Sequence, residues 1–270
     1  MIMVEPSYVA STITGVLYGV LAWFPVALNG AFTSKVLSSI DPNLSNHLVP
    51  AYLGMMLAVL FYFRGSIERA LQMLFRRRSE ADLKFLFYAS IFTVVVGYPL
   101  YMGLSTRLSP FQSDAANAII GILIAATALF KLEKRSRIQQ LESGMRERRD
   151  EPTLVDSIVT GIAQGVAFIG GISRAGMSVL PLLLSGINAR KVLELSFLLA
   201  PVYLVLRLIF IGDYTPVSPL DSFIVFTASF AASIVTMHLL LKLADKSGRK
   251  AVGIVFGVVA VSIYALGVMI

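Results

Sequence analysis

Residues 170–178 read Gly170-Gly171-Ile172-Ser173-Arg174-Ala175-Gly176-Met177-Ser178, and they interrupt an apolar region that extends from residue 155 to residue 187. Each apolar half is about 14 to 17 residues long, whereas a helix needs about 20 residues to cross a bilayer. A helix that stops inside the hydrocarbon leaves backbone N–H and C=O groups unpaired, which is tolerated only where protein or a wet cavity surrounds the break. The sequence therefore predicts a re-entrant helical hairpin over 155–187.

A second apolar region, residues 8–39, is broken in the same way. Its break contains Phe24-Pro25 and Asn29-Gly30, and its halves are again too short to span a bilayer. By the same argument about unpaired backbone groups, the sequence predicts a second re-entrant helical hairpin over 8–39.

The composition is that of an integral membrane protein. Hydrophobic residues make up 56% of the 270-residue chain and charged residues only 14%, far below the roughly one-quarter charged fraction of soluble domains. Cysteine is absent and there are only 2 histidines, so neither a thiolate nor a histidine-rich metal centre is predicted. Six further stretches are apolar and near the length of a full span: 45–64, 84–104, 115–132, 191–211, 219–244 and 250–270.

The basic residues predict the orientation in the cell membrane, because lysine and arginine collect in cytoplasmic loops. Most of the 23 basic residues fall in the segments 64–84, 131–149, 187–191 and 242–250. These segments share one side if the 155–187 hairpin enters and leaves by the same face, and both termini are then extracytoplasmic. The net charge of +7 follows from this rule and requires no nucleic-acid partner; the predicted surroundings are membrane lipids.

The two broken regions share one sequence frame. Sliding the chain by 146 residues aligns three pairs of glycines, namely Gly15 with Gly161, Gly19 with Gly165, and Gly30 with Gly176. Each region precedes three predicted spans, an odd number, so the second copy is upside down relative to the first. The predicted fold is all-α, with six transmembrane helices and two re-entrant hairpins in inverted repeats. The repeats are residues 1–135 and 153–270, and a basic cytoplasmic linker, residues 136–152, joins them.

The polar residues of the 170–178 break form a candidate anion site. An arginine at membrane depth is unfavourable and usually faces a cavity on a ligand path. Gly171 and Gly176 leave backbone N–H groups accessible, and a helix that starts near Ser173 directs its positive end to the same place. Ser173 and Ser178 add hydroxyl donors, and the planar guanidinium of Arg174 fits a phosphate or a carboxylate. The alternative is that Arg174 pairs with loop carbonyls and braces the hairpin.

These residues also resemble a known family. The runs 161–164 (GIAQ) and 169–176 (IGGISRAG) resemble the second motif, P-G-T-S-R-S-G, of the undecaprenyl-diphosphate phosphatase family of the bacitracin-resistance type. Residues 194–200 (ELSFLLA) resemble its E-F-S-F-L-L-A stretch, and residues 15–31 align with its first motif. The resemblance covers nearly the whole chain. It implies a polyprenyl diphosphate or phosphate lipid as ligand, and it adds Tyr18, Asn29, Gly30 and Gln164 to the predicted binding residues.

The chain departs from the family in the first motif, which resembles E-G-x-x-E-F-x-P-x-S-S-x-G-H. Residues 18–31 read YGVLAWFPVALNGA, so both glutamates, the serine pair and the histidine are absent. Tyr18 and Ala22 stand at the glutamate positions, while Gly19, Pro25 and Gly30 remain. The shape of the hairpin is thus expected to be kept while its acid, base and metal-ligand groups are lost.

Hydrolysis of a diphosphate needs a nucleophile, a group that activates it, and charge stabilisation beyond one arginine. If the protein is an enzyme, Ser173 and Arg174 are the predicted catalytic residues, and Mg²⁺ or Ca²⁺ is the cofactor to test. No base is evident, since the candidates Asp156, Glu194 and His238 have simpler structural interpretations.

The sequence therefore predicts a protein that binds polyprenyl phosphate or diphosphate headgroups, of undecaprenyl or dolichyl type, and translocates the carrier lipid without hydrolysing it. One alternative is an active polyprenyl-diphosphate phosphatase with a rearranged site. Another is a lipid-binding protein that does not transport. A second copy of the chain, forming a homodimer, is a further candidate partner. Arg207, near the end of a predicted span, is expected to extend to the membrane interface.

Overall fold

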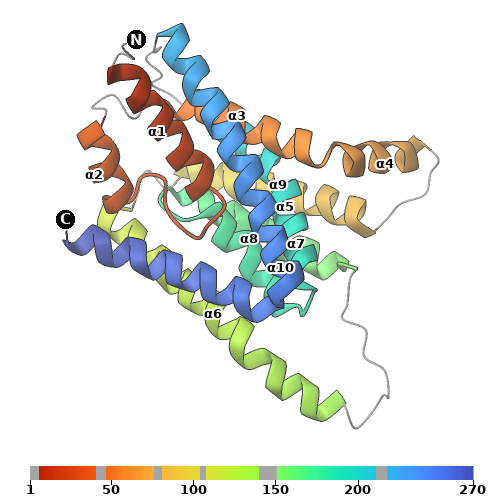
Figure 1. Cartoon of the computed structure of the whole chain (residues 1–270). Coiled ribbons are helices and arrows are strands. Elements are labelled where there is room, and N and C mark those ends of the chain that lie inside the picture. The colour runs from red at the N-terminus through yellow and green to blue at the C-terminus, as the bar shows by residue number, and fades with distance from the viewer. Residues whose placement is uncertain are drawn as a thin grey trace.

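The computed structural model describes residues 6–40, 47–75, 81–103, 108–139, 151–210 and 218–269, and within these ranges every regular element is a helix (Figure 1). The elements are α1 (Pro6–Leu21), α2 (Ala31–Ile40), α3 (Leu48–Tyr62), α4 (Arg64–Phe75), α5 (Ala81–Gly103), α6 (Pro110–Gln139), α7 (Leu154–Val166), the short 3₁₀ helix η2 (Ala167–Ile169), α8 (Arg174–Leu184), α9 (Ala189–Ile209) and α10 (Pro219–Met269). The predicted all-α fold is confirmed.

Several of these helices are apolar enough to lie in a membrane. Four are also long enough to cross one: α5, residues 110–130 of α6, α9 and α10. Helix α3 is apolar but has only 15 residues, about 22 Å at 1.5 Å per residue, so it is shorter than the predicted span 45–64. The chain is thus a multi-pass membrane protein with both long and short apolar helices.

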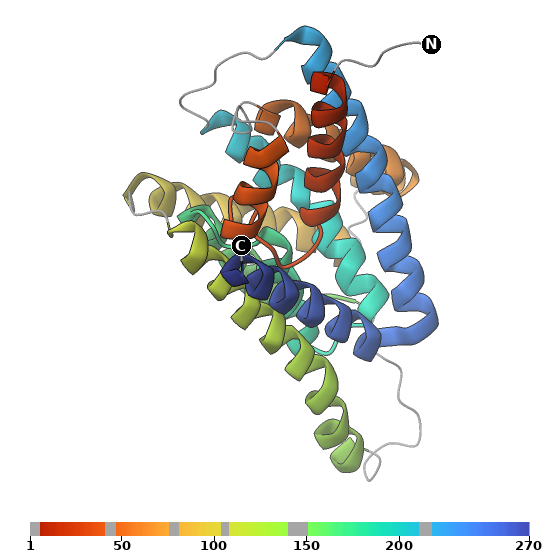
Figure 2. The ribbon, with the colours of Figure 1, turned by 60° about the vertical axis from the view of Figure 1, so that its left-hand side comes forward.

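Helix α10 contains the boundary expected between the last two spans. Gly248 has a φ of 65° and a ψ of −160°, which are not helical angles. Figures 1 and 2 both show two straight arms that meet at a sharp angle. The bend lies between the predicted spans 219–244 and 250–270, in the cluster of basic residues that the sequence placed on the cytoplasmic side.

The segment after α3 differs from the prediction. Residues 65–83 were expected to form a cytoplasmic loop, but 64–75 form the polar helix α4, which follows α3 after Phe63. Basic residues do not prevent helix formation, since arginine is among the better helix formers. Of the predicted basic linker, residues 136–152, residues 140–150 lie outside the described ranges.

Both broken regions form two helices separated by a non-helical break, as predicted. The first consists of α1 and α2 with a break at 22–30, and the second of α7, η2 and α8 with a break at 170–173. Helix α1 packs against α10, and α7 packs against α5. A methyl group on Gly15 would lie 2.7 Å from a backbone oxygen of α10, and one on Gly161 would lie 2.5 Å from a backbone oxygen of α5. The two aligned glycines therefore permit equivalent close helix contacts.

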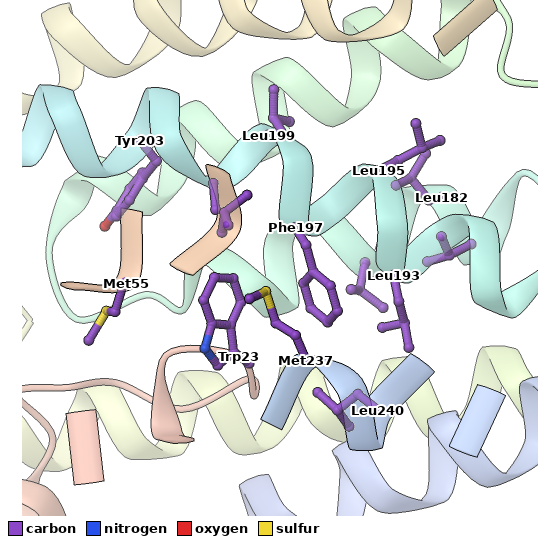
Figure 3. Close-up of a cluster of buried hydrophobic side chains, with 14 of the residues drawn as sticks. Trp23, Met55, Leu182, Leu193, Leu195, Phe197, Leu199, Tyr203, Met237 and Leu240 are labelled. Carbon is purple, nitrogen blue, oxygen red and sulfur yellow. The ribbon is translucent and has the colours of Figure 1, made fainter. Parts of the chain in front are cut away.

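The first break is anchored in the hydrophobic core. Trp23 is fully buried, and its ring meets that of Phe197 at 5.2 Å between centroids with an interplanar angle of 80°. Figure 3 shows the two rings beside each other with Met237 next to them. Because Phe197 lies on α9 and Met237 on α10, this packing fixes the first break against two long helices.

Candidate functional site

The two breaks meet inside the protein. The hydroxyl of Ser173, in the second break, donates a hydrogen bond to the carbonyl oxygen of Phe24 in the first at 2.8 Å. Gly176 lies against Pro25, because a methyl group on Gly176 would be 3.0 Å from the Cβ atom of Pro25. Segments about 150 residues apart in the chain thus form one site.

The second break presents the N-terminus of α8. Ser173 is the N-cap residue, with extended backbone angles, and its hydroxyl accepts a hydrogen bond from the Gly176 N–H at 3.3 Å. Gly170 and Gly171 precede it with φ of 84° and 86°, a conformation that glycine adopts without steric cost. The first-turn N–H groups of α8 and its positive dipole end therefore lie where the two breaks meet.

Arg174 braces this junction. Its side chain is buried, its Nη1 donates to the carbonyl of Ser196 at 3.2 Å, and its Nη2 donates to the carbonyl of Ala22 at 3.1 Å. The guanidinium carbon lies 5.0 Å from the centre of the Trp23 ring, a cation–π contact. The bracing contacts considered from the sequence are therefore present, and the same side chain also lines a cavity.

The cavity is small, about 60 Å³, and lies between the two breaks, α3 and α9. This volume is too small for an isoprenoid chain. Its lining residues are Ala22, Val26, Ala27, Leu28, Asn29, Tyr52, Met55, Gly171, Ile172, Ser173, Arg174, Tyr203, Leu204 and Arg207. Among these described residues two are arginines, and none is a carboxylate or an imidazole.

Arg207 also lines the cavity, although it was not among the predicted binding residues. It was expected to extend to the membrane interface, but its Nε donates to the hydroxyl of Tyr203 at 3.0 Å, and its guanidinium lies 5.7 Å from the Phe168 ring centre. The spacing of the two residues could have indicated this contact, because Tyr203 precedes Arg207 by one helical turn.

The predicted binding residues divide into two groups. Gly171, Ser173, Arg174 and Asn29 line the cavity. The five others do not, namely Tyr18, Gly30, Gln164, Gly176 and Ser178.

The second group has internal contacts instead. Gln164 donates to the carbonyl of Leu199 at 3.3 Å, and the Ser178 hydroxyl bonds to the carbonyl of Arg174 at 3.0 Å. Gly30 packs so closely on α6 that an added methyl group would lie 1.8 Å from a carboxylate oxygen of Asp114. These contacts join α7 to α9, lie within α8, and place the first break against α6.

Asn117 of α6 holds the second break in place, although no motif around Asn117 indicates this contact. Its side-chain Nδ2 donates to the carbonyl of Gly171 at 2.7 Å, and its Oδ1 accepts from the N–H of Ser173 at 2.7 Å. Both partners lie in a buried, non-helical segment that has lost its regular backbone bonds, so the asparagine side chain replaces them.

Replacing Asn117 with alanine is expected to lower the free energy of unfolding by about 2–4 kcal/mol, because it leaves two buried backbone groups without partners. The measurement is chemical unfolding in detergent micelles. Thr227→Ala is the matched control, since that exposed hydroxyl bonds only within its own helix, and it is expected to change the free energy by less than about 0.5 kcal/mol. Equal effects of the two substitutions would contradict the role given to Asn117.

The acidic and imidazole groups considered as bases lie elsewhere. Asp156 belongs to the capping box that starts α7. Glu194 pairs with Arg190 at 2.8 Å rather than capping α9, whose N-cap residue is Asn188. The Nδ1 atom of His238 lies 3.2 Å from the hydroxyl of Tyr62.

A metal ion held by the protein does not fit these side chains. Within the described ranges, no three His, Cys, Asp or Glu side chains are grouped so that they could hold one. The oxygen ligands that Mg²⁺ and Ca²⁺ prefer are carboxylates and carbonyls, and the cavity lining supplies no carboxylate. The described side chains of the cavity therefore do not form a site for Mg²⁺ or Ca²⁺.

Comparison with known proteins agrees with the resemblance found in the sequence. The chain is 31% identical over 256 residues to an undecaprenyl-diphosphatase of Haloarcula marismortui, covering 90% of this chain and 92% of that protein. It is 29% identical to an undecaprenyl-diphosphatase of Methanococcoides burtonii, over 87% of this chain and 89% of that one. A third, from Methanothrix thermoacetophila, is 28% identical over 94% of this chain and 96% of its own length.

A match to a protein-family model also covers the whole site. The model described as bacitracin resistance protein BacA matches residues 11–262, which include both breaks, every residue of the cavity lining and the bend in α10. The predicted relationship to the bacitracin-resistance type is confirmed. The chain belongs to the bacitracin resistance protein BacA family.

Proposed function

We propose that the protein is a polyprenyl-diphosphate phosphatase that holds the headgroup of its lipid substrate in the cavity between the two breaks. The observation that carries the proposal is the pairing of Ser173 and Arg174 at the N-terminus of α8, in a cavity whose described lining has cations but no carboxylate. A helix N-terminus beside an arginine suits a phosphate. The names of the relatives, undecaprenyl-diphosphatase, support the substrate class.

In the proposed reaction, Arg174 and the first-turn N–H groups of α8 hold the terminal phosphate. The Ser173 oxygen attacks the terminal phosphorus, and the bond between that phosphorus and the bridging oxygen breaks. The serine proton passes to the departing lipid monophosphate. Water then releases orthophosphate from the serine. To react, the Ser173 hydroxyl must leave its bond to the Phe24 carbonyl, so substrate binding has to change the junction of the breaks.

The same lining predicts slow turnover. General acid–base catalysis by a positioned side chain contributes about 10²- to 10⁴-fold, and the described cavity residues include no carboxylate or imidazole for this task. The phosphate oxygens of the substrate are therefore the proposed proton acceptors, and we expect turnover below that of relatives that have the two glutamates of the first motif.

A second candidate function follows from the same observation. A site that binds a polyprenyl phosphate without a base to hydrolyse it is suited to a carrier-lipid translocator, the function first predicted from the sequence. The relatives' names favour the phosphatase; the absence of carboxylates from the described lining favours the translocator.

Phosphate release distinguishes the two functions. Purified protein with a polyprenyl diphosphate is expected to release orthophosphate, and Ser173→Ala is expected to stop the release. Because Ser173→Ala also removes the N-cap of α8, Ser173→Asn serves as a variant that can keep the cap but cannot attack phosphorus. Binding of the lipid without release by the wild-type protein would favour the translocator.

We also propose that the chain consists of two inverted repeats, 1–135 and 153–270, with six full spans and two re-entrant hairpins. Three packing arrangements support this. The helix pair α1–α10 corresponds to α7–α5, the pair α2–α10 corresponds to α8–α6, and the aligned glycines Gly15 and Gly161 occupy matching contacts. In this arrangement two broken hairpins enter from opposite faces and meet around a central site.

The inverted arrangement predicts the exposure of two serines on opposite sides of the membrane. Ser218, just before α10, is expected outside the cell, and Ser247, at the bend in α10, is expected inside; both are exposed. Because the native chain has no cysteine, single cysteines at these positions are clean probes. A membrane-impermeant thiol reagent on intact cells should label Ser218→Cys and not Ser247→Cys. The reverse labelling pattern would contradict the topology.

A further inference from the structure

Arg207 has the geometry of a ligand-binding residue rather than of an interface anchor. It is half-buried on α9, and its Nε is held by the hydroxyl of Tyr203 at 3.0 Å. That hydroxyl in turn donates to the carbonyl of Ala167 at 3.3 Å. The guanidinium lies 5.6 Å from the Tyr203 ring centre. These contacts fix its orientation, so the loss of side-chain entropy on binding a ligand is reduced.

Within the described ranges, the charge of Arg207 has no acidic partner. Among the described residues, no carboxylate pairs with Arg207, and no acceptor bonds to its terminal nitrogens Nη1 and Nη2. Arg174 differs, since both of its terminal nitrogens donate to backbone carbonyls. Counting only bonds to described residues, Arg207 therefore retains more donors for a ligand than Arg174 does.

The two arginines reach one cavity from different helices. Arg174 comes from the start of α8 and Arg207 from the last turn of α9, and the hydroxyl-bearing residues Tyr52 and Tyr203 line the same cavity. An ionised cation in a poorly solvated site is stabilised by an anion or by several neutral acceptors. Two cations that reach the cavity from different helices suit a ligand with two linked phosphates, because each phosphate can then pair with its own guanidinium.

We propose that Arg207 binds the second phosphate of a lipid diphosphate and makes the site selective for diphosphate over monophosphate lipids. This inference rests on the proposed headgroup site and adds to it a residue that determines specificity. A monophosphate engages the N-terminus of α8 and Arg174 alone. A diphosphate engages Arg174 and the terminal nitrogens of Arg207 together, and the monophosphate product cannot contact both, which favours its release.

The test compares two ligands that the protein cannot convert into each other. Farnesyl methylene-bisphosphonate replaces the diphosphate with a bridge that is not hydrolysed, and farnesyl phosphate supplies the monophosphate with the same chain. Dissociation constants are measured by calorimetry for the wild type, Arg207→Gln and Arg207→Lys. The control is Arg64→Gln, which removes one positive charge from an exposed arginine at the start of α4, outside the cavity.

The wild type is expected to bind the bisphosphonate about 10- to 100-fold more tightly than the monophosphate, the range for one charge-assisted contact. Arg207→Gln should remove most of that ratio and change monophosphate binding by less than about 3-fold, which is within the usual spread of substitution effects away from a ligand. Arg207→Lys, which keeps the charge but not the planar fork, should restore part of the ratio. Arg64→Gln should leave the ratio unchanged.

Two results would overturn the inference. One is equal affinity of the wild type for the two ligands. The other is an unchanged ratio in Arg207→Gln, whether neither affinity changes or both fall equally through a general charge effect. These results leave the proposed headgroup site standing. Failure of the wild type to bind either ligand would instead remove the proposed function, and this inference with it.

Discussion

Replacing Arg174 with alanine is expected to lower phosphate release from a polyprenyl diphosphate by about 10²- to 10³-fold, the range for removing one donor that stabilises developing charge. The loss also includes weaker lipid binding, by about 10- to 100-fold for one charge-assisted hydrogen bond. The effect is large because the guanidinium lies at the N-terminus of α8, where both breaks meet, and lines the cavity. The measurement is kcat and KM for the purified variant.

The bracing role of Arg174 requires a control for folding. The carbonyls of Ala22 and Ser196 lose their donor in Arg174→Ala, so thermal unfolding is measured beside activity. Arg174→Lys keeps the charge without the planar fork, and we expect it to recover binding in part but to remain slow. If a folded Arg174→Ala protein binds and hydrolyses the lipid like the wild type, the arginine is a structural brace only.

Installing a glutamate at position 22 is expected to raise phosphate release by about 10²-fold or more, the lower end of what a positioned base contributes. Ala22 lines the cavity, and its carbonyl accepts a bond from Arg174 at 3.1 Å. A carboxylate there is near the headgroup and stands where the family motif has its second glutamate. The increase should appear as kcat, measured above pH 6, where an unperturbed glutamate is ionised.

The matched control is Ala22→Gln, which has the same size but cannot accept a proton. It should not raise the rate. Adding Tyr18→Glu and Ala31→His to Ala22→Glu restores further motif groups. This tests whether each restored group raises the rate of phosphate release further. If Ala22→Glu and Ala22→Gln behave alike, the absence of a base is not what limits turnover, and the argument from the missing motif residues is wrong.

The breaks and the bend could be predicted because their signals are local. Glycine and proline interrupt the apolar regions at Pro25 and Gly170, and the structure has non-helical backbone at both places. The basic cluster around 242–250 marked the end of a span, and Gly248 bends α10 there. Chain hydropathy thus predicted where helices stop. It failed at α4, because counting arginines as loop residues ignores their helix propensity.

The composition of the cavity could not be predicted, because its residues meet only in the fold. Asn117 bonds to Gly171 from 54 positions away in the chain, and nothing beside Asn117 in sequence indicates that contact. Arg207 looked like a residue near a span end, and the ring of Tyr203 and the position of α9 hold it in the cavity instead. Conversely, Ser178 is near Arg174 in sequence but bonds within its own helix and to Ser196.

The most direct test of the central claim follows a fluorescent short-chain polyprenyl diphosphate in liposomes that contain the purified protein. Orthophosphate release and the leaflet position of the lipid are measured in the same preparation. The account predicts that each orthophosphate released is matched by one molecule of polyprenyl monophosphate, and that Arg174→Ala lowers both by about 10²- to 10³-fold. Exchange of the lipid between leaflets without orthophosphate release, and loss of that exchange in Arg174→Ala, would contradict the phosphatase and establish the translocator.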